Sequence, residues 1–363
     1  MPGHTNLIPP VWSGNPQADG NAWDLGFLAR GYYLNDQRIQ WSGLESTFAV
    51  EGVLSPVFKH REGDWETSVE GEFYLNQPND RNILLDTPER QSYAANFDIP
   101  PWQISQLFIR CRYDDLTVML GKIPTPFGRT YFPLYTNSRM DAPFIRTECI
   151  DWWETGLLVR YQPGWFIADV AITNGGTDRD TNSSKALVSR VGIETPAFAA
   201  GASIKIQDGV GSDEDKQFDN YAGLDIMYRF GPWTLSGEAL YDQYGFRQPG
   251  FDPNDIYWGR SLYYRDNNYA PGVADWGVGY YVNLGYEDDR WGLTLNYGEF
   301  YPQRTGDPSQ DVTIRRGLVK VSYRFTPHLL TYNMLLRETD IADAQDNRPR
   351  QGLAILTGLQ YTF

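Results

Sequence analysis

No run of apolar residues in this chain approaches the ~20 residues that a transmembrane helix needs, and the mean hydropathy is −0.49. Cysteine is scarce: the chain has only Cys111 and Cys149, which are too few for a disulfide framework. Basic residues are outnumbered, with 31 Lys and Arg against 46 Asp and Glu and a net charge of −15. These deficits exclude a helical membrane protein and argue against a nucleic-acid-binding surface.

Histidine, the most frequent general base in enzymes, occurs as His4, His60 and His328, in the N-terminal segment and in two predicted tight turns. None of the three lies on a predicted strand beside a candidate serine. The spacings G-x-S-x-G and H-E-x-x-H and the P-loop are absent, and the acidic stretches 178–182 and 208–215 do not fit an EF-hand loop. The sequence therefore predicts no enzyme, no metal site and no cofactor.

Apolar and polar residues alternate along sixteen short segments of the chain. In the last segment Ile355, Leu359 and Phe363 share one face, while Gly358 and Gln360 share the other. A period of two residues is typical of β-strands that separate an apolar from a polar environment. The predicted strands are 25–34, 43–56, 65–76, 104–113, 115–122, 155–162, 165–174, 186–194, 199–207, 221–230, 233–242, 276–286, 291–300, 314–325, 329–338 and 351–363.

The connections between these segments alternate between short and long. Connections after even-numbered strands are tight and carry Pro and Gly, as at 162–164 and 231–232. Connections after odd-numbered strands are long, notably 77–103, 123–154 and 243–275. In outer-membrane barrels the short turns face the periplasm and the long loops face outward.

Bulky aromatic residues flank the tight turns on the apolar face. Trp65, Trp233 and Trp291 each open a strand, and Phe230 and Phe325 each close one. Such a girdle marks one membrane–water boundary. The sequence therefore predicts an all-β fold, a transmembrane antiparallel β-barrel of about 16 strands, located in the bacterial outer membrane.

The barrel is expected over 23–363, preceded by a periplasmic tail at 1–22. The chain start lacks the charged and apolar parts of a signal peptide, so we expect a mature chain. Cys111 belongs to the lipid-facing row near the periplasmic end of its strand, and Cys149 belongs to the long outer connection. A disulfide needs Cα atoms within about 7 Å, so two free thiols are expected.

The stretch Gly121-Lys122-Ile123-Pro124-Thr125-Pro126-Phe127-Gly128-Arg129 resembles the G-K-x-x-T-P-F-G motif of the phosphate-selective porin O and P family. Downstream, 154–157 and 172–178 resemble the strand opening and the Asn-Gly loop that follow in that family. The specific resemblance covers about 105–195, and the end Tyr361-Thr362-Phe363 resembles the terminal signal of outer-membrane proteins in general. The resemblance implies a trimer of sixteen-stranded barrels, each narrowed by an inward loop, with arginines and lysines that attract anions.

The connection 123–154 has the features of a functional loop. It leaves its strand at Pro124 and Pro126, contains Pro133 and Pro143, and is rich in aromatic residues. Proline stiffens the segment and keeps it out of a sheet, and a connection of this length is functional or disordered. We expect it to fold into the lumen as a constriction loop; the alternative is a lid over the outer mouth.

Charges on the polar face would set selectivity. The basic residues of this face are predicted as Arg30, Arg110, Arg112, Arg160, Arg190, Lys205, Arg229, Lys320, Arg324 and Arg337. The candidate binding residues are those near the loop, namely Arg110, Arg112, Lys122, Arg129, Arg160 and Arg190. They would form an electropositive strip on one wall, suited to guiding anions.

The sequence thus predicts a porin, a water-filled channel for passive diffusion of small hydrophilic solutes and ions. Acidic residues on the polar face are as plentiful as basic ones, so a general diffusion pore is preferred and phosphate selectivity does not follow. Expected partners are small solutes or anions, outer-membrane lipid, and further copies in a homotrimer, for which Gly31, Ala200 and Ala202 offer small outward residues. The alternative is a partner-sheathing barrel, such as the porin component of an outer-membrane electron conduit.

Overall fold

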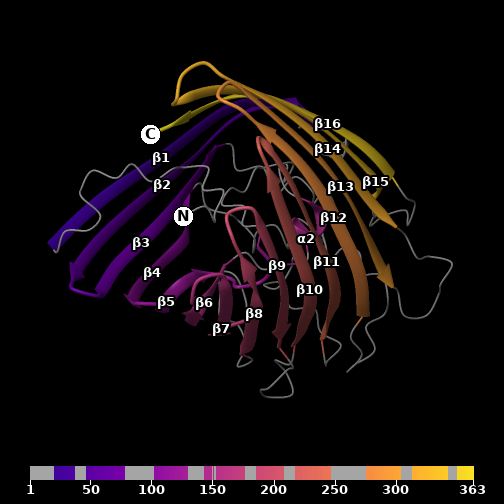
Figure 1. The fold of residues 1–363 in the computed structure, drawn as a ribbon. Coiled ribbons are helices and arrows are strands. Elements are labelled where there is room, and N and C mark those ends of the chain that lie inside the picture. The colour runs from indigo at the N-terminus through magenta and orange to yellow at the C-terminus, as the bar shows by residue number, and fades with distance from the viewer. Residues whose placement is uncertain are drawn as a thin grey trace.

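The computed structural model of the chain is a closed antiparallel β-barrel of sixteen strands in chain order (Figure 1). It describes residues 20–36, 46–77, 102–129, 143–148, 150, 153–175, 185–207, 217–246, 275–303, 313–341 and 350–363. The circle closes where β1 pairs with β16. Phe27 and the last residue, Phe363, exchange both backbone hydrogen bonds at this seam, at 2.9 and 2.8 Å. Closure leaves no unpaired sheet edge, as a barrel in lipid requires.

The strands are β1 (Gly20–Asp36), β2 (Ser46–Glu62), β3 (Trp65–Gln77), β4 (Trp102–Tyr113), β5 (Leu116–Pro124), β6 (Trp153–Tyr161), β7 (Phe166–Thr173), β8 (Ala186–Glu194), β9 (Phe198–Ile206), β10 (Gln217–Phe230), β11 (Trp233–Phe246), β12 (Asp275–Glu287), β13 (Trp291–Gln303), β14 (Ile314–Arg324), β15 (Leu329–Ile341) and β16 (Arg350–Thr362). Within the parts of the chain that the structure describes, one short helix, α2 (Phe144–Glu148), lies between β5 and β6. Among the described residues, no helix has the length and hydropathy to span a membrane.

The predicted strand positions are confirmed, with one larger difference at the first hairpin. β1 begins at Gly20 and β2 continues to Glu62, because their pairing extends to Gly20 opposite Arg61. The barrel therefore begins inside the segment expected to be a tail, and residues 1–19 lie outside the described residues. Cys111 is a free thiol, and Cys149 is also outside the described residues.

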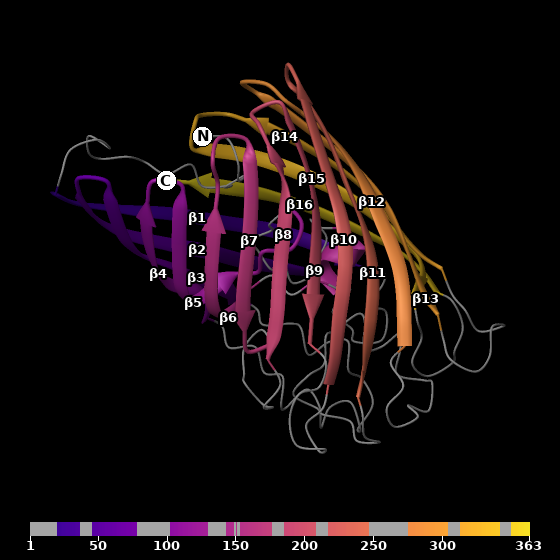
Figure 2. The ribbon, with the colours of Figure 1, turned by 60° about the horizontal axis from the view of Figure 1, so that its bottom comes forward.

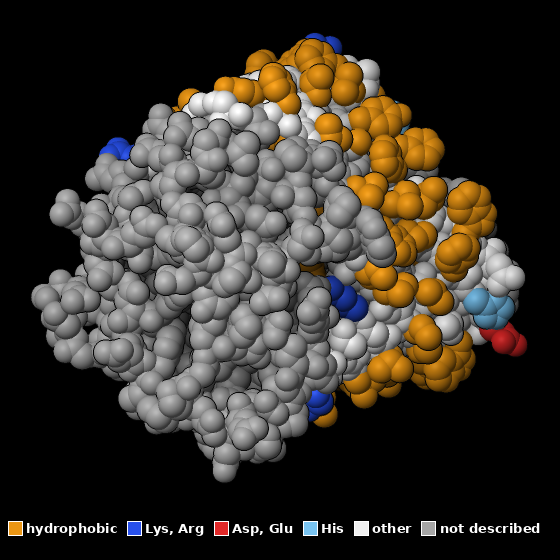
Figure 3. Space-filling model, turned by 180° about the vertical axis from the view of Figure 1, so that it is seen from behind, with side chains coloured by type: hydrophobic (Ala, Val, Ile, Leu, Met, Phe, Trp, Pro, Cys, Tyr) orange, Lys and Arg blue, Asp and Glu red, His pale blue; other side chains and the backbone are white. Residues whose placement is uncertain are grey.

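The alternation of the sequence separates outward from inward side chains. On β10, Leu224 and Ile226 are 64% and 53% exposed, whereas Asp225 and Met227 between and after them are 7% and 3% exposed. Hydrophobic side chains accordingly gather on the outside of the described strands (Figure 3). A protein with such an apolar outer surface would aggregate in water, whereas the surface suits a lipid environment.

The short turns gather at one end of the barrel (Figure 2). They use residues that tolerate a left-handed backbone, such as Asp114 with φ 51° and Gly231 with φ 56°. Just inside this end, three Trp–Tyr pairs lie across adjacent strands, each with ring centroids 4.8 Å apart, namely Trp65–Tyr113, Trp233–Tyr286 and Trp291–Tyr323. Their regular placement forms the girdle that the sequence predicted.

Candidate functional site: the lumen and the connection 123–154

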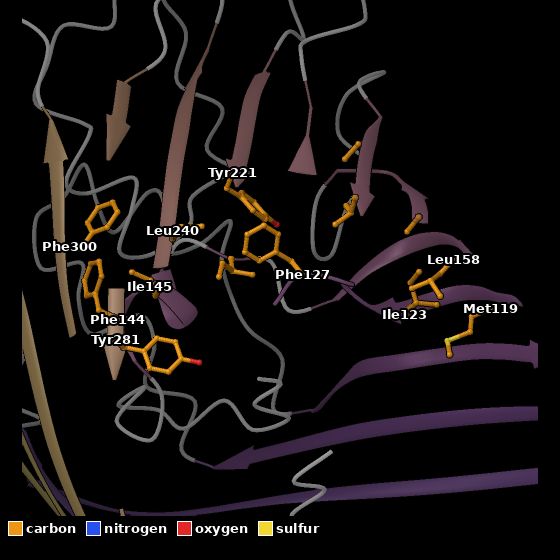
Figure 4. Packing of buried hydrophobic residues seen from close by; sticks show 14 of the residues in the cluster. Met119, Ile123, Phe127, Phe144, Ile145, Leu158, Tyr221, Leu240, Tyr281 and Phe300 are labelled. Carbon is orange, nitrogen blue, oxygen red and sulfur yellow. The ribbon is translucent and has the colours of Figure 1, made fainter. Parts of the chain in front are cut away.

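The connection after β5 turns into the lumen at Phe127. The Phe127 ring packs edge-on against the Tyr221 ring of β10, with ring centroids 4.6 Å apart (Figure 4). A Cβ on Gly223 of β10 would lie 2.8 Å from Phe127 Cζ, so this glycine makes room for the ring. The backbone N–H of Gly128 donates to Ser203 Oγ of β9 at 2.9 Å. These contacts fix residues 127 and 128 on the inner face of β9 and β10.

Helix α2, in the second described part of the connection, packs on the inner face of β12 and β13. Phe144 stacks on Phe300 of β13 with centroids 5.4 Å apart, and both rings are buried (Figure 4). A Cβ on Gly279 of β12 would lie 2.6 Å from Ile145 Cγ2, so a glycine again makes room. The described parts of the connection therefore contact inward-facing residues over several adjacent strands.

Arg146 of α2 fixes this arrangement by a buried ion pair with Glu238 of β11. Its Nε and Nη2 donate to the two carboxylate oxygens at 2.6 and 2.9 Å, and its Nη1 donates to the carbonyl of Phe127 at 3.0 Å. Burial by itself would lower the pKa of Arg146, but the charge of Glu238 and its hydrogen bond outweigh burial and raise that pKa. The guanidinium thus stays charged and joins the two parts of the connection to the barrel wall.

A second ion pair lies where the connection ends, at the first residues of β6. Lys205 of β9 donates to Glu154 Oε1 at 2.5 Å, and the Thr173 hydroxyl of β7 donates to the other carboxylate oxygen. All three side chains are buried. Because removing one partner from a buried pair is costly, this end of the connection is also firmly attached.

Three of the predicted arginines share one row of the sheet. Cross-strand pairing runs from Arg112 to Thr117, then to Arg160, Asp169 and Arg190. Directly paired residues point to the same face, so these side chains line one lumen-facing row, here called the arginine row. The sequence indicated the face, and the pairing register brings the residues into line.

Carboxylates accompany most of these arginines. Arg160 binds Asp169 with two hydrogen bonds of 2.7 and 2.8 Å, and Arg190 binds Asp225 with two of 3.0 and 2.8 Å. The latter pair reaches across β9 above Gly201, where a Cβ would lie 2.8 Å from both partners. The strip is therefore not purely positive, because partner carboxylates lie within it.

The other predicted residues have different surroundings. Arg110 contacts Glu70 at 2.6 Å and Glu66 at 3.6 Å, both on β3, and the Arg112 Nε–H donates to the carbonyl of Asp114 at 3.2 Å. Arg129 donates to Glu194 Oε1, with Nε and Nη2 at 3.1 and 2.9 Å from it. This pair connects the inward segment to the end of β8.

Lys122 does not belong to the lumen-facing set. It pairs with Leu107, which is 43% exposed on the outer face, and directly paired residues share a face. Its ammonium group donates to the carbonyl of Ile104 at 2.9 Å and lies over the ring of Trp153 at 5.5 Å. Lys122 lies at the start of the connection, as expected, but on the outer face, so it is not part of the electropositive strip.

Sequence reasoning missed two features of the lumen. Arg146 was not singled out, because a charge within a long connection has no period that reveals its direction. The inner surface also includes a second group of buried, mostly apolar side chains, here called the apolar wall, formed by Tyr32, Leu34, Ala49, Leu318, Tyr332, Met334, Leu336, Ala354 and Leu356. A clue existed in the inward row of β16, where Ala354 and Leu356 stand in place of charges.

The fold is similar to solved outer-membrane channels. An anion-selective porin from Comamonas acidovorans superimposes with a TM-score of 0.65 at 11% identity, covering 94% of this chain and 100% of that chain. The outer membrane channel DcaP of Acinetobacter baumannii gives 0.63 at 12% identity, and OmpF of Salmonella typhi in complex with daunomycin gives 0.61 at 12% identity; each covers 95% of this chain and 98% of the other. No family model and no curated protein sequence matches the chain. At these identities the likeness establishes the sixteen-stranded porin fold.

Proposed function

We propose that this protein is a porin of the bacterial outer membrane, a water-filled channel for passive diffusion of small hydrophilic solutes and ions. The observation that carries the proposal is a closed barrel with an apolar exterior and a charged inner row, Arg112 to Arg190, beside an inward-turned connection. The similar structures include an anion-selective porin and an outer membrane channel, which agrees with this function. We propose that the protein assembles as a homotrimer, as OmpT of Vibrio cholerae does in its trimer form.

The connection 123–154 is the constriction of this channel. Its described parts contact β9 to β13 from the inside, and Arg129 reaches Glu194. A fixed loop on the lumen side reduces the cross-section available to a solute. The domain arrangement is thus one barrel with an internal constriction loop.

We propose a weak anion preference, set by the exposed edges of the arginine row. Arg160 keeps 24% of its side chain exposed although it is paired, and Arg112 is exposed. Charges in a restricted aqueous channel are screened less than charges on an open surface. The accompanying carboxylates reduce the effect, so phosphate selectivity of the porin O and P type is not proposed.

The competing function is a sheath around a partner protein, such as a multihaem cytochrome. Such a barrel needs an open lumen, whereas here Phe127, Phe144 and Arg146 of the chain itself occupy the inner face of β9 to β13. Catalysis is not proposed either. His60 contacts Asn21, and His328 contacts the carbonyl of Thr362, both at the turn end of the barrel.

Single-channel recording in planar bilayers tests the proposal. We expect stable conductance, a reversal potential of anion sign in a salt gradient, and no haem absorbance in the purified protein. The double variant Arg112→Glu, Arg160→Glu should move the reversal potential toward cations. The matched control Arg324→Glu removes an arginine from β14, outside the row, and should change it little. If the wild type prefers cations and neither variant changes the sign, the row does not set selectivity.

A further inference from the structure

The inner face of β11 to β13 carries a group of uncharged polar side chains on the turn side of helix α2. Its members occupy two adjacent rows of cross-strand pairs. They alternate with outward side chains such as Val282 and Leu295, which are 49% and 38% exposed, so they point into the lumen. They are called the polar patch here and are Ser236, Asn283 and Asn296 in one row and Thr234 and Thr294 in the next.

The polar patch begins beside the attachment of the constriction loop. Ser236 lies two residues from Glu238, the partner of Arg146, which is about 7 Å along β11 toward the turn. In the closed order of sixteen strands, β12 is eight strands from β4, so the patch faces the part of the wall that carries Arg112. A solute that leaves the constriction toward the turn end therefore meets the polar patch on one side and charged side chains on the other.

The polar groups of the patch are open to solutes. Within the described part of the chain none of these side chains donates or accepts a hydrogen bond, and none of their polar atoms is sealed from solvent. Gly285 separates Thr234 from Thr294. A Cβ at Gly285 would find its nearest described atoms, the carbonyl oxygen and Cβ of Thr234, at 3.8 and 4.0 Å. The glycine thus leaves space for a solute between the two hydroxyl groups.

The polar patch is uncharged and bordered by two basic residues. The row of the threonines ends in Arg229 and Lys320, and neither row of the patch contains a carboxylate. Beyond β14 the inner face of β15 belongs to the apolar wall. Arg337 of β15 was predicted on the inner face, but it pairs with Gly317, which pairs in turn with the exposed Tyr297. Arg337 therefore faces outward, and that prediction is wrong.

The chemistry of the patch suits a particular class of solute. Hydroxyl and carboxamide side chains each offer donors and acceptors without net charge. A solute that displaces their waters loses affinity unless it reproduces the hydrogen bonds of those waters. The hydroxyls of a sugar donate and accept, whereas an ion finds no countercharge in the patch and an ether has no donor for the carboxamide oxygens. The patch therefore favours neutral polyhydroxylated solutes.

We propose that the polar patch is a binding surface for neutral saccharides on their way through the channel. This inference rests on the proposed porin function and assigns neutral solutes to a wall other than the arginine row. Asn283 and Asn296 pair directly, so their Cβ atoms are about 5 Å apart. The two carboxamides bind hydroxyl groups of one sugar, and the threonine hydroxyls beside Gly285 bind others.

Swelling of liposomes that contain the full-length protein tests this surface. The rate is measured in sucrose and in an oligo(ethylene glycol) dimethyl ether of the same hydrodynamic radius, which accepts hydrogen bonds but donates none. A change in pore radius alters both rates alike, so the sucrose-to-ether ratio isolates hydrogen bonding. We expect sucrose to enter the wild type faster than the ether does. The ratio should fall at least threefold in Asn283→Leu, Asn296→Leu and at least twofold in the nearly isosteric Thr234→Val, Thr294→Val.

The matched control is Asn333→Leu, which replaces an exposed carboxamide on the outward face of β15 and should leave the ratio as in the wild type. An unchanged ratio in either double variant overturns the proposal, as do equal rates of the two solutes in the wild type. Ion conductance is recorded on the same preparations. A wild type that conducts but does not distinguish the solutes refutes this surface alone, and one that does not conduct refutes the channel. Heat-modifiable migration like that of the wild type verifies that each variant is folded.

Discussion

Two parts of the inner surface follow the same alternating pattern and differ in their contact with water. The arginine row on β4 to β8 keeps Arg112 exposed and Arg160 partly exposed. The apolar wall on β14 to β16, β1 and β2 is nearly dry, with Leu336 and Leu356 at 0% exposure. Facing the lumen is therefore not the same as facing water.

Ion pairs on the inner surface also differ in their exposure. Arg30–Glu51 and Arg316–Glu338 lie beside the apolar wall and are almost fully buried, whereas Arg110 with Glu66 and Glu70 is 20–27% exposed. A buried pair gains little over an apolar replacement, but breaking it is costly. A partly exposed pair contributes about 0–1 kcal/mol and interacts with passing ions. Arg190–Asp225 of the arginine row is as buried as the pairs beside the apolar wall, at 3% and 4% exposure, so both regions contain buried pairs and only the partly exposed pairs interact with ions.

The largest effect is expected from the Arg146–Glu238 pair, which holds the connection 123–154 on the inner face of the barrel. Arg146→Ala leaves Glu238 buried and uncompensated, which costs about 3–5 kcal/mol, and releases α2 from β11. We expect a lower midpoint in urea unfolding and larger, noisier channel currents. The double variant Arg146→Met, Glu238→Leu should recover most of the stability, because both charges are removed. Unchanged currents in Arg146→Ala would contradict a constriction held by this pair.

The apolar wall is tested next, within one strand. Leu356→Ala removes a side chain at 0% exposure and should cost about 2–5 kcal/mol through the cavity left behind. Leu359→Ala removes the same atoms from an outward position that is 54% exposed, where lipid fills the space. The difference in urea midpoints measures how dry the apolar wall is. Equal midpoints for the two variants would show that the wall is wet.

A smaller effect is expected at the edge of the arginine row. Gly201→Ala places a Cβ 2.8 Å from Arg190 Nη2 and Asp225 Oδ2, which forces this pair to shift, at a cost of about 1–3 kcal/mol. Gly31→Ala adds the same methyl group where nothing lies within 4 Å. We expect the unfolding midpoint to fall in Gly201→Ala and to stay unchanged in Gly31→Ala. If both variants unfold alike, the Arg190–Asp225 pair tolerates displacement.

The strands, the outward or inward direction of most of their side chains, and the aromatic girdle were predictable from the sequence. A period of two residues and turn chemistry are local properties. β8 lies where the alternation predicted it, and the turn at Gly231 where Pro and Gly predicted it. The first hairpin was predicted too short, since its extension depends on pairing between Gly20 and Arg61 and not on composition.

The charge of a side chain and the face of the sheet to which it points could also be predicted from the sequence, because both depend only on neighbouring residues. The sequence showed that Arg112, Arg160 and Arg190 share a face, but only the register of five strands placed them in one row. Lys122 was grouped with the lumen arginines because it lies at the start of the connection, whereas its pairing with Leu107 places it on the outer face.

The sequence alone determined that this chain forms a barrel with one apolar face, because alternation constrains every strand independently. Only the tertiary structure decided which inward side chains meet water, which carboxylate accompanies each arginine, and where Arg146 attaches the connection. Those properties depend on contacts between residues as far apart as Arg146 and Glu238, and closure of the barrel is what brings such residues together.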